Sequence, residues 1–189
     1  LKNCHNVILR DFSILKGGHF GILCTGVDNL TVDNLKIDTD RDGMDIDCCK
    51  NVRVTNCFVN APWDDGICPK SSFALGYNRP TQNVAIANCY VSGCWQLGTL
   101  LDGTYKRQST GGGRIKCGTE SNGGFINIAI SNCVFEGTQG LALETVDGAH
   151  RHQDAAQHPH LGERAAVDQQ LLLAGARLGD VDRREGALV

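Results

Sequence analysis

The chain has 189 residues, of which 41% are apolar, and a formal net charge of -3 at pH 7. This length and apolar content suit one hydrophobic core, and the absence of basic clusters argues against nucleic acid as a partner. No stretch is apolar enough to cross a bilayer, so we expect no membrane partner. The chain opens on Leu1 with an incomplete first repeat, so we expect an internal fragment without a signal peptide, whose localisation cannot be read directly.

A short phrase repeats five times along residues 1–148. Each copy opens on an Asn and alternates apolar residues over a few positions, and the copies start at Asn6, Asn29, Asn51, Asn83 and Asn127. The starts lie 23, 22, 32 and 44 residues apart, so the unit is about 22 residues, with an insertion in the third interval and roughly a second coil in the fourth. Short alternating phrases with variable loops are typical of a solenoid of strands. We therefore predict an all-β fold, a right-handed parallel β-helix.

Three copies end in Asn-Cys, which places Cys57, Cys89 and Cys133 at identical coil positions. Stacking would make these thiols an internal column and the asparagines a column at a turn, where Asn tolerates a left-handed backbone. All ten cysteines precede residue 134, which could suggest disulfides, yet identical positions favour stacked free thiols. No paired CxxC spacing exists, so we predict no metal site from the cysteines.

The composition changes near Gly148. Residues 149–189 contain no Ile, Phe, Tyr, Trp, Cys, Asn, Ser, Thr, Lys or Met. We therefore divide the chain into a β-helix fragment at 1–148 and an atypical tail at 149–189. A non-native reading frame is the preferred explanation of the tail, and a genuine disordered or helical segment, with helix propensity at 165–178, is the alternative.

The first acidic cluster, at residues 38–47, imitates a calcium loop with oxygen ligands at alternate positions. The imitation fails because the twelfth position from Asp38 is Cys49 instead of a bidentate Glu, and a strand follows. Alternation explains the segment better, because Met44 and Ile46 would share a packed face and the intervening aspartates an acidic one.

The second acidic cluster, at residues 62–68, follows 22 residues later, counted from Asp42 to Asp64. One coil of separation would bring Asp42 beside Asp64 and Asp65, about 5 Å away in the stacking direction. Either Asp-Gly step alone would be an ordinary turn. Three converging carboxylates repel one another unless they share a proton, and shared protons are what acid/base hydrolysis uses.

These two segments carry a family resemblance. Residues 40–45 resemble the Asn-Thr-Asp-Gly-x-Asp segment of glycoside hydrolase family 28, the polygalacturonase and rhamnogalacturonase family of right-handed parallel β-helices, and residues 63–71 resemble its Gly-Asp-Asp-Cys-x-x-x-Lys-Ser segment. Similarity extends through residues 118–124 to about Gly148. The resemblance implies a secreted or periplasmic enzyme, expected to be monomeric and without a cofactor, that hydrolyses pectic galacturonan or rhamnogalacturonan with inversion.

Carried onto matching positions, the resemblance makes Asp64 the general acid and Asp42 and Asp65 the residues that hold and deprotonate the attacking water. An inverting pair needs roughly 6.5–9.5 Å between acid and base to admit that water. Neighbouring anions would also keep the acid protonated near neutral pH.

Two family features are altered. The usual Gly-His-Gly aligns with residues 112–114, which lack the His, and the usual Arg-Ile-Lys aligns with Ala-Leu-Glu at 142–144. Arg114 and Lys116 alternate onto one strand face one coil earlier, where they could bind a uronate carboxylate or sugar hydroxyls. A simple surface strand is the alternative.

Further candidates for substrate binding are Asp45, Lys70 and Glu120, with a solvated surface lysine as the alternative for Lys70. Glu144 lies in the same general region. Trp63 and Trp95 could stack on a sugar ring, although a Trp beside a turn is more often packed. The loop at 95–113 is long enough to wall one end of a cleft, which would favour an end-acting enzyme.

Two other functional classes stay open. A β-helix lyase would need calcium and a basic residue, and the failed calcium loop counts against it. A non-catalytic carbohydrate-binding helix, or an inactive truncated homologue, would explain the missing His.

Overall fold

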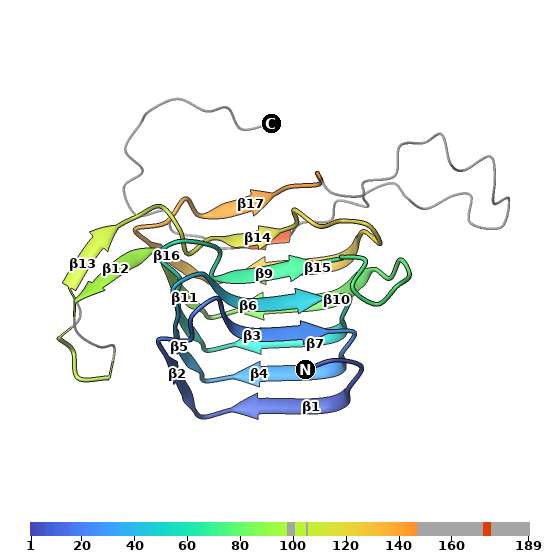
Figure 1. Cartoon of the computed structure of the whole chain (residues 1–189), viewed down its shortest axis with the longest axis horizontal. Helices are drawn as coiled ribbons and strands as arrows, with labels where there is room; N and C mark the ends of the chain where they lie inside the picture. Colours follow the sequence, from blue (N-terminus) through green and yellow to red (C-terminus); the bar gives the residue numbers. More distant parts are fainter. Residues whose placement is uncertain (98–100, 105, 147–171, 175–189) are drawn as a thin grey trace, which may run out of the picture.

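The computed structural model describes residues 1–97, 101–104, 106–146 and 172–174 (Figure 1). Within these ranges every regular element is a strand, and most strands belong to three parallel sheets. The first sheet contains β1 (His5–Arg10), β4 (Asp28–Asp33), β7 (Lys50–Thr55), β10 (Thr81–Ala87), β15 (Phe125–Ser131) and β18 (Leu172–Ala174). The second contains β2 (Ser13–Leu15), β5 (Lys36–Asp38), β8 (Phe58–Asn60), β11 (Tyr90–Ser92) and β16 (Val134–Glu136). The third contains β3 (Phe20–Thr25), β6 (Asp42–Asp47), β9 (Ile67–Lys70), β14 (Ile115–Cys117) and β17 (Leu141–Leu143).

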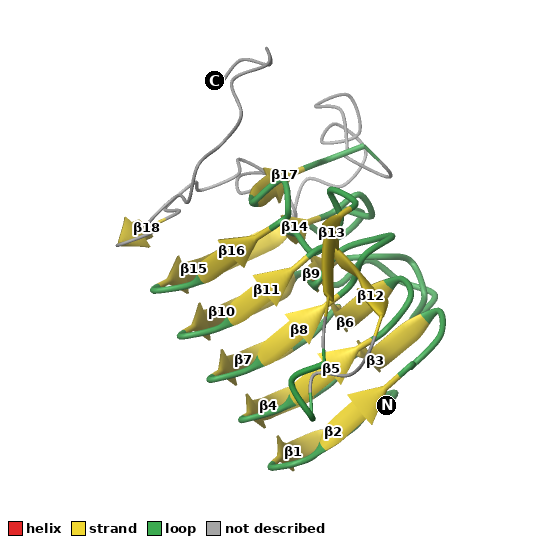
Figure 2. Ribbon diagram, turned by 90° about the vertical axis from the view of Figure 1, so that its left-hand side faces the viewer, coloured by secondary structure: helices red, strands yellow, loops and turns green. Residues whose placement is uncertain are grey.

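The chain visits the first, second and third sheets in turn and then returns to the first, so each round adds one strand to every sheet. Figures 1 and 2 show these rounds stacked on one another. Neighbouring strands in a sheet therefore come from successive rounds, as in the pairing of Asp28 with Lys50. This all-β stack of parallel sheets is consistent with the predicted parallel β-helix.

The fourth interval between repeats is a single coil, and the prediction of roughly a second coil there was wrong. Strand β10 pairs directly with β15, with Gln82 opposite Ile126, although 44 residues separate them. The additional residues include the antiparallel hairpin of β12 (Cys94–Leu97) and β13 (Lys106–Ser109). An inserted segment that pairs with itself adds length without adding a layer, and the hairpin projects from the side of the stack (Figure 1).

The core forms because strands of the first sheet alternate between interior and solvent, whereas β6 in the third sheet is buried along its whole length. In β7, Val52 and Val54 are buried, whereas Asn51 and Arg53 are exposed. Burial of each such aliphatic side chain contributes roughly 1.5–3 kcal/mol. The predicted cysteine column is confirmed, because its three thiols are buried and all ten cysteines of the chain are free; the column consists of Cys57, Cys89 and Cys133.

The predicted asparagine column, Asn56, Asn88 and Asn132, is confirmed at the turn that leaves the first sheet, where φ lies between 50° and 56° and the Asn132 amide donates to the Asn88 Oδ1 atom at 2.6 Å. A second asparagine column, which begins at Asn6, lies at the turn that enters the first sheet. Its members have φ between 54° and 57°. Each side-chain amide donates to the Oδ1 atom of the asparagine one coil earlier, for example from Asn51 to Asn29 at 3.1 Å and from Asn127 to Asn83 at 2.9 Å. We expected each asparagine side chain to hydrogen-bond to the backbone of its stacked neighbour. In the structure it bonds to the neighbouring asparagine side chain instead.

The proposed tail at 149–189 lies outside the described residues except for Leu172–Ala174. Those three residues form β18, which pairs in parallel with β15. The frame error and its alternatives therefore stay predictions. The described part of the chain contains no helix that could cross a membrane.

Candidate functional site

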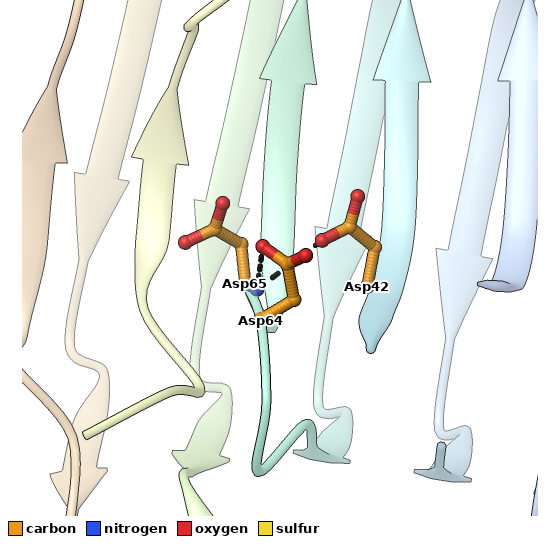
Figure 3. Close-up of side chains that lie close together, drawn as sticks. All are labelled: Asp42, Asp64 and Asp65. Atoms are coloured by element: carbon orange, nitrogen blue, oxygen red, sulfur yellow. Dashed lines mark hydrogen bonds between the residues drawn. The ribbon is translucent and has the colours of Figure 1, made fainter. Parts of the chain in front are cut away.

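The two acidic clusters meet where the strands of the third sheet begin. Asp42 is the first residue of β6, and Asp64 and Asp65 immediately precede β9 on the next coil (Figure 3). One carboxylate oxygen of each residue lies within 4.8 Å of the others, so the predicted convergence is confirmed. The register, which pairs Met44 with Ile67, is 23 residues instead of the 22 counted from the sequence.

This register decides which side chains are neighbours. Asp42 is aligned with Asp65, whose backbone N–H donates to the Asp42 Oδ1 atom at 3.2 Å. Asp64 is aligned with Arg41. The backbone N–H of Asp65 is shared, because it also lies 3.1 Å from the Oδ1 atom of Asp64. One backbone donor thus holds two of the three carboxyl groups.

Glycines allow the coils to approach at this point. The N–H of Gly43 donates to the carbonyl of Asp65 at 2.8 Å, and the N–H of Gly66 donates to the carbonyl of Arg114 at 2.8 Å. A Cβ atom on Gly43 would overlap the Gly66 carbonyl oxygen and the Val59 side chain. The Asp-Gly steps therefore set the spacing of the site as well as its charge.

Lys70 joins two buried aspartates of β6. Its Nζ atom lies 3.0 Å from Asp42 and 3.1 Å from Asp45. Burial, followed by the charge of Asp42, raises the pKa of Asp45 to about 8 despite the attraction of Lys70. Burial also raises the pKa of Asp42. The Oδ1 atom of Asp45 has no hydrogen-bond partner, which agrees with a protonated, uncharged carboxyl group at that position.

Asp65 is buried between two cations, with a side chain that is only 1% exposed. The Nε atom of Arg114 lies 2.7 Å from its Oδ1 atom, and the Nζ atom of Lys116 lies 2.6 Å from its Oδ2 atom. Burial disfavours the charge of Lys116, but the hydrogen bond and charge of Asp65 outweigh it and raise the pKa of that lysine. Lys116 lies within β14 and Arg114 immediately before it, and both side chains contact Asp65, so they do not form a simple surface strand. Their binding of a substrate carboxylate stays a prediction.

Asp64 is the most exposed of the three carboxyl groups and is held by Arg41. The Nη2 and Nε atoms of Arg41 lie 2.7 and 3.0 Å from its Oδ2 atom. Burial would raise the pKa of Asp64, but hydrogen bonds from Arg41 and Asp42 and the charges of Arg41 and Lys116 lower it. The expectation that neighbouring anions keep Asp64 protonated is therefore not met here, because a guanidinium outweighs them.

The two predicted glutamates lie at the border of this network. Glu120 lies 4.0 Å from Lys70, and Glu144 lies 3.4 Å from Arg114 and 3.8 Å from Lys116. Lys70 itself is not the solvated surface lysine of the alternative. The sequence thus named every carboxylate and every cation of the network except Arg41.

Arg41 was missed although it stands inside one of the two motifs. A signal for it did exist: it lies 23 residues before Asp64, which is one coil in this part of the chain. The count of 22 residues placed Asp42 there instead.

The surroundings of the acidic turn include one exposed aromatic side chain. Trp63 is 59% exposed, so packing does not explain it. The side chain of Trp95 lies outside the described residues. The base of the hairpin reaches the turn, because the N–H of Gly113 donates to the carbonyl of Asp64 at 2.7 Å and the hydroxyl of Thr110 to that of Pro62. The end of the loop at 95–113 thus lies beside the acidic turn, and the cleft wall and end-acting attack stay predictions.

The donor set fits an ion-pair network better than a divalent metal. Asp42, Asp64 and Asp65 could together offer oxygen ligands to a cation. Each of them, however, already has a lysine or arginine nitrogen within 3.0 Å. Asp38, the first position of the calcium-loop imitation, is the last residue of β5 and accepts a hydrogen bond from Asn60.

This arrangement combines two kinds of carboxyl group. Asp42 and Asp45 are buried and have raised pKa values, which favour a bound proton, whereas the more exposed Asp64 has a lowered pKa. Such a separation of pKa values between neighbouring carboxyl groups suits acid/base catalysis. Comparison of the chain with protein-family models, with curated proteins and with solved structures found no match.

Proposed function

We propose that the chain is a right-handed parallel β-helix of the glycoside hydrolase family 28 type, which hydrolyses pectic polysaccharide of the galacturonan or rhamnogalacturonan kind. The right hand is supported by the general preference of crossovers between parallel strands. The observation that carries the function is the meeting of three aspartates from neighbouring coils within 4.8 Å, ringed by four cations.

In this proposal Asp64 is the general acid, and Asp42 and Asp65 hold and activate water. The three carboxyl groups lie too close together for inversion in this arrangement, because an inverting pair needs roughly 6.5 Å or more between its carboxyl groups. Asp64 would have to turn outward by about 2 Å to reach that separation. It is the carboxyl group best able to do so, because its side chain is 21% exposed, whereas Asp42 and Asp65 are enclosed.

A pectic substrate is supported by the character of the surrounding side chains. Lys70, Arg114 and Lys116 supply positive charge next to the acids, which suits a uronate, and Asp45 and Glu120 complete the proposed substrate-binding set. The exposed ring of Trp63 can stack on a sugar. We propose no cofactor, a monomer, and a secreted or periplasmic location.

The test is product analysis after incubation with polygalacturonate and rhamnogalacturonan oligosaccharides in the presence of a chelator. The parent chain should give saturated products, and Asp64→Asn should give none while keeping its β-sheet circular dichroism. Asp40→Asn is the matched control, because this exposed aspartate lies on the same turn and should retain activity. NMR of the first anomer released distinguishes inversion from retention.

Unsaturated products that require calcium would instead identify a lyase. A non-catalytic carbohydrate-binding helix is the second candidate, and the ion pair between Arg41 and Asp64 favours it, because a carboxylate locked to a guanidinium donates no proton. Binding of oligosaccharide without any product, equal in the parent and Asp64→Asn, would establish that candidate.

A further inference from the structure

Arg41 differs from the other cations of the site in exposure and in partners. Its side chain is 51% exposed, and its guanidinium donates twice to a single oxygen of Asp64. Lys70, Arg114 and Lys116 are far more enclosed, and each faces at least two carboxylates. Arg41 is therefore the cation that can change partner with the least disturbance of the fold.

The Arg41 side chain also has a geometry that invites exchange. A guanidinium presents a planar fork of donors that matches a carboxylate bidentately. In the structure both donors meet one oxygen of Asp64, so this fork is not matched to both oxygens of its partner. A second carboxylate arriving from solvent could offer the paired acceptors that Asp64 does not.

We propose that Arg41 is a positioning residue that recognises the carboxylate of a uronate sugar and, in binding it, releases Asp64 to face the glycosidic oxygen. This inference rests on the proposed function and deepens it, because it makes a negatively charged sugar beside the scissile bond a requirement for a competent acid. It also accounts for the ion pair between Arg41 and the candidate acid.

The charges around Asp64 support the consequence of that exchange. Asp64 faces Arg41 from the preceding turn, Asp42 from β6, Lys116 from β14 and its own neighbour Asp65. Hydrogen bonds from Arg41 contribute to the lowered pKa of Asp64. When the guanidinium leaves, its hydrogen bonds and its charge no longer lower that pKa while burial still acts to raise it, so the pKa moves upward, which is the direction a general acid needs.

The test compares trigalacturonate with its carboxyl-reduced, uncharged analogue on the full chain. Arg41→Gln should lower kcat/KM and affinity for trigalacturonate by about tenfold or more, the size expected for a lost charged hydrogen bond. Affinity for the uncharged analogue should stay within about twofold, and kcat/KM for it should not fall, because the substitution also frees Asp64 from the guanidinium. Arg41→Lys should recover only part of the loss, because lysine keeps the charge without the fork. Arg53→Gln, at an exposed position of β7 in the first sheet, is the matched control.

The pH profile provides a readout that a purely structural role would not move. With the uncharged analogue, the alkaline limb of kcat/KM should shift to higher pH in Arg41→Gln, because Asp64 in the free enzyme has lost its cation. Equal losses of kcat/KM on both substrates, or an alkaline limb that does not shift, would overturn the inference about Arg41. Neither result would contradict the proposed hydrolase function.

Affinity measured by calorimetry distinguishes failure of the Arg41 inference from failure of the proposed function. Binding of trigalacturonate that depends on Arg41 without any hydrolysis would sink the proposed function and keep carboxylate recognition by Arg41. A parent chain that neither binds nor cleaves trigalacturonate would overturn both.

Discussion

The turn that enters the first sheet and the turn that enters the third sheet are built from the same coils and have opposite characters. The first repeats one residue, and Asn6, Asn29, Asn51, Asn83 and Asn127 form a neutral ladder of hydrogen bonds. The second changes residue from coil to coil and gathers aspartates, lysines and arginines instead. Repetition at one corner stabilises the stack, and variation at the other supplies chemistry.

The charged corner also depends more on burial than the neutral one. Asp65 and Lys116 are almost enclosed, so each ion needs its partner, whereas the ladder asparagines face solvent and can bond to water if a neighbour is lost. Substitutions at the third-sheet corner should therefore cost more stability than substitutions at the first. The following experiments test that order.

The largest effect is expected from Gly43→Ala, because the new Cβ atom would overlap the carbonyl of Gly66, and backbone cannot move aside as a side chain can. We expect a loss of about 3 kcal/mol or more in the free energy of unfolding, measured by urea denaturation. Gly76→Ala is the control, because a Cβ there meets open space and bears only the strain of a positive φ. Equal losses in the two variants would show that the coils do not approach as described.

The next effect is expected from Lys116→Met, which removes one of two cations from the buried Asp65. We expect a loss of roughly 3 kcal/mol, the lower end for breaking a buried pair, because Arg114 remains. Urea denaturation at neutral pH measures it. Lys36→Met, at an exposed position of β5, is the control. A loss no larger than that of the control would mean that Asp65 is not enclosed by its cations.

A pH dependence should follow from Asp45. Its pKa is raised from 3.8 to about 8, so its stabilising contribution is complete below about pH 4 and is lost as the pH rises through 8. The free energy of unfolding should fall across that window by an amount on the order of a few kcal/mol. In Asp45→Asn this fall should be reduced, and a parallel pH curve for parent and variant would contradict the assignment.

The smallest effect is expected at the neutral corner. Asn51→Ala removes a donor to Asn29 and an acceptor for Asn83 at a φ of 57°, and should cost about 1–2 kcal/mol. Asn51→Gly loses the same hydrogen bonds without the strain of a left-handed backbone, so it should be the milder variant in thermal unfolding. A larger loss in Asn51→Gly would mean that backbone conformation is not what Asn supplies there.

Much of the fold was predictable because it depends on local, repeated signals. The alternation around Asn51 and the matching Asn-Cys steps indicated strands, turns and buried columns without any knowledge of distant contacts. The fourth interval was misjudged because its length alone does not distinguish a coil from a hairpin. Pairing of β12 with β13 is a choice between competing partners, and spacing cannot make that choice.

The sequence by itself determined which residue types gather at the site, since Asp42, Asp64 and Asp65 stand one coil apart in recognisable motifs. It did not determine which of these side chains pair with one another. A register of 23 instead of 22 residues aligns Arg41 with Asp64, and that single step reverses the expected direction of an acid's pKa. Hydrogen-bond register, burial and ion pairing are properties of neighbouring coils, so only the tertiary structure could decide them.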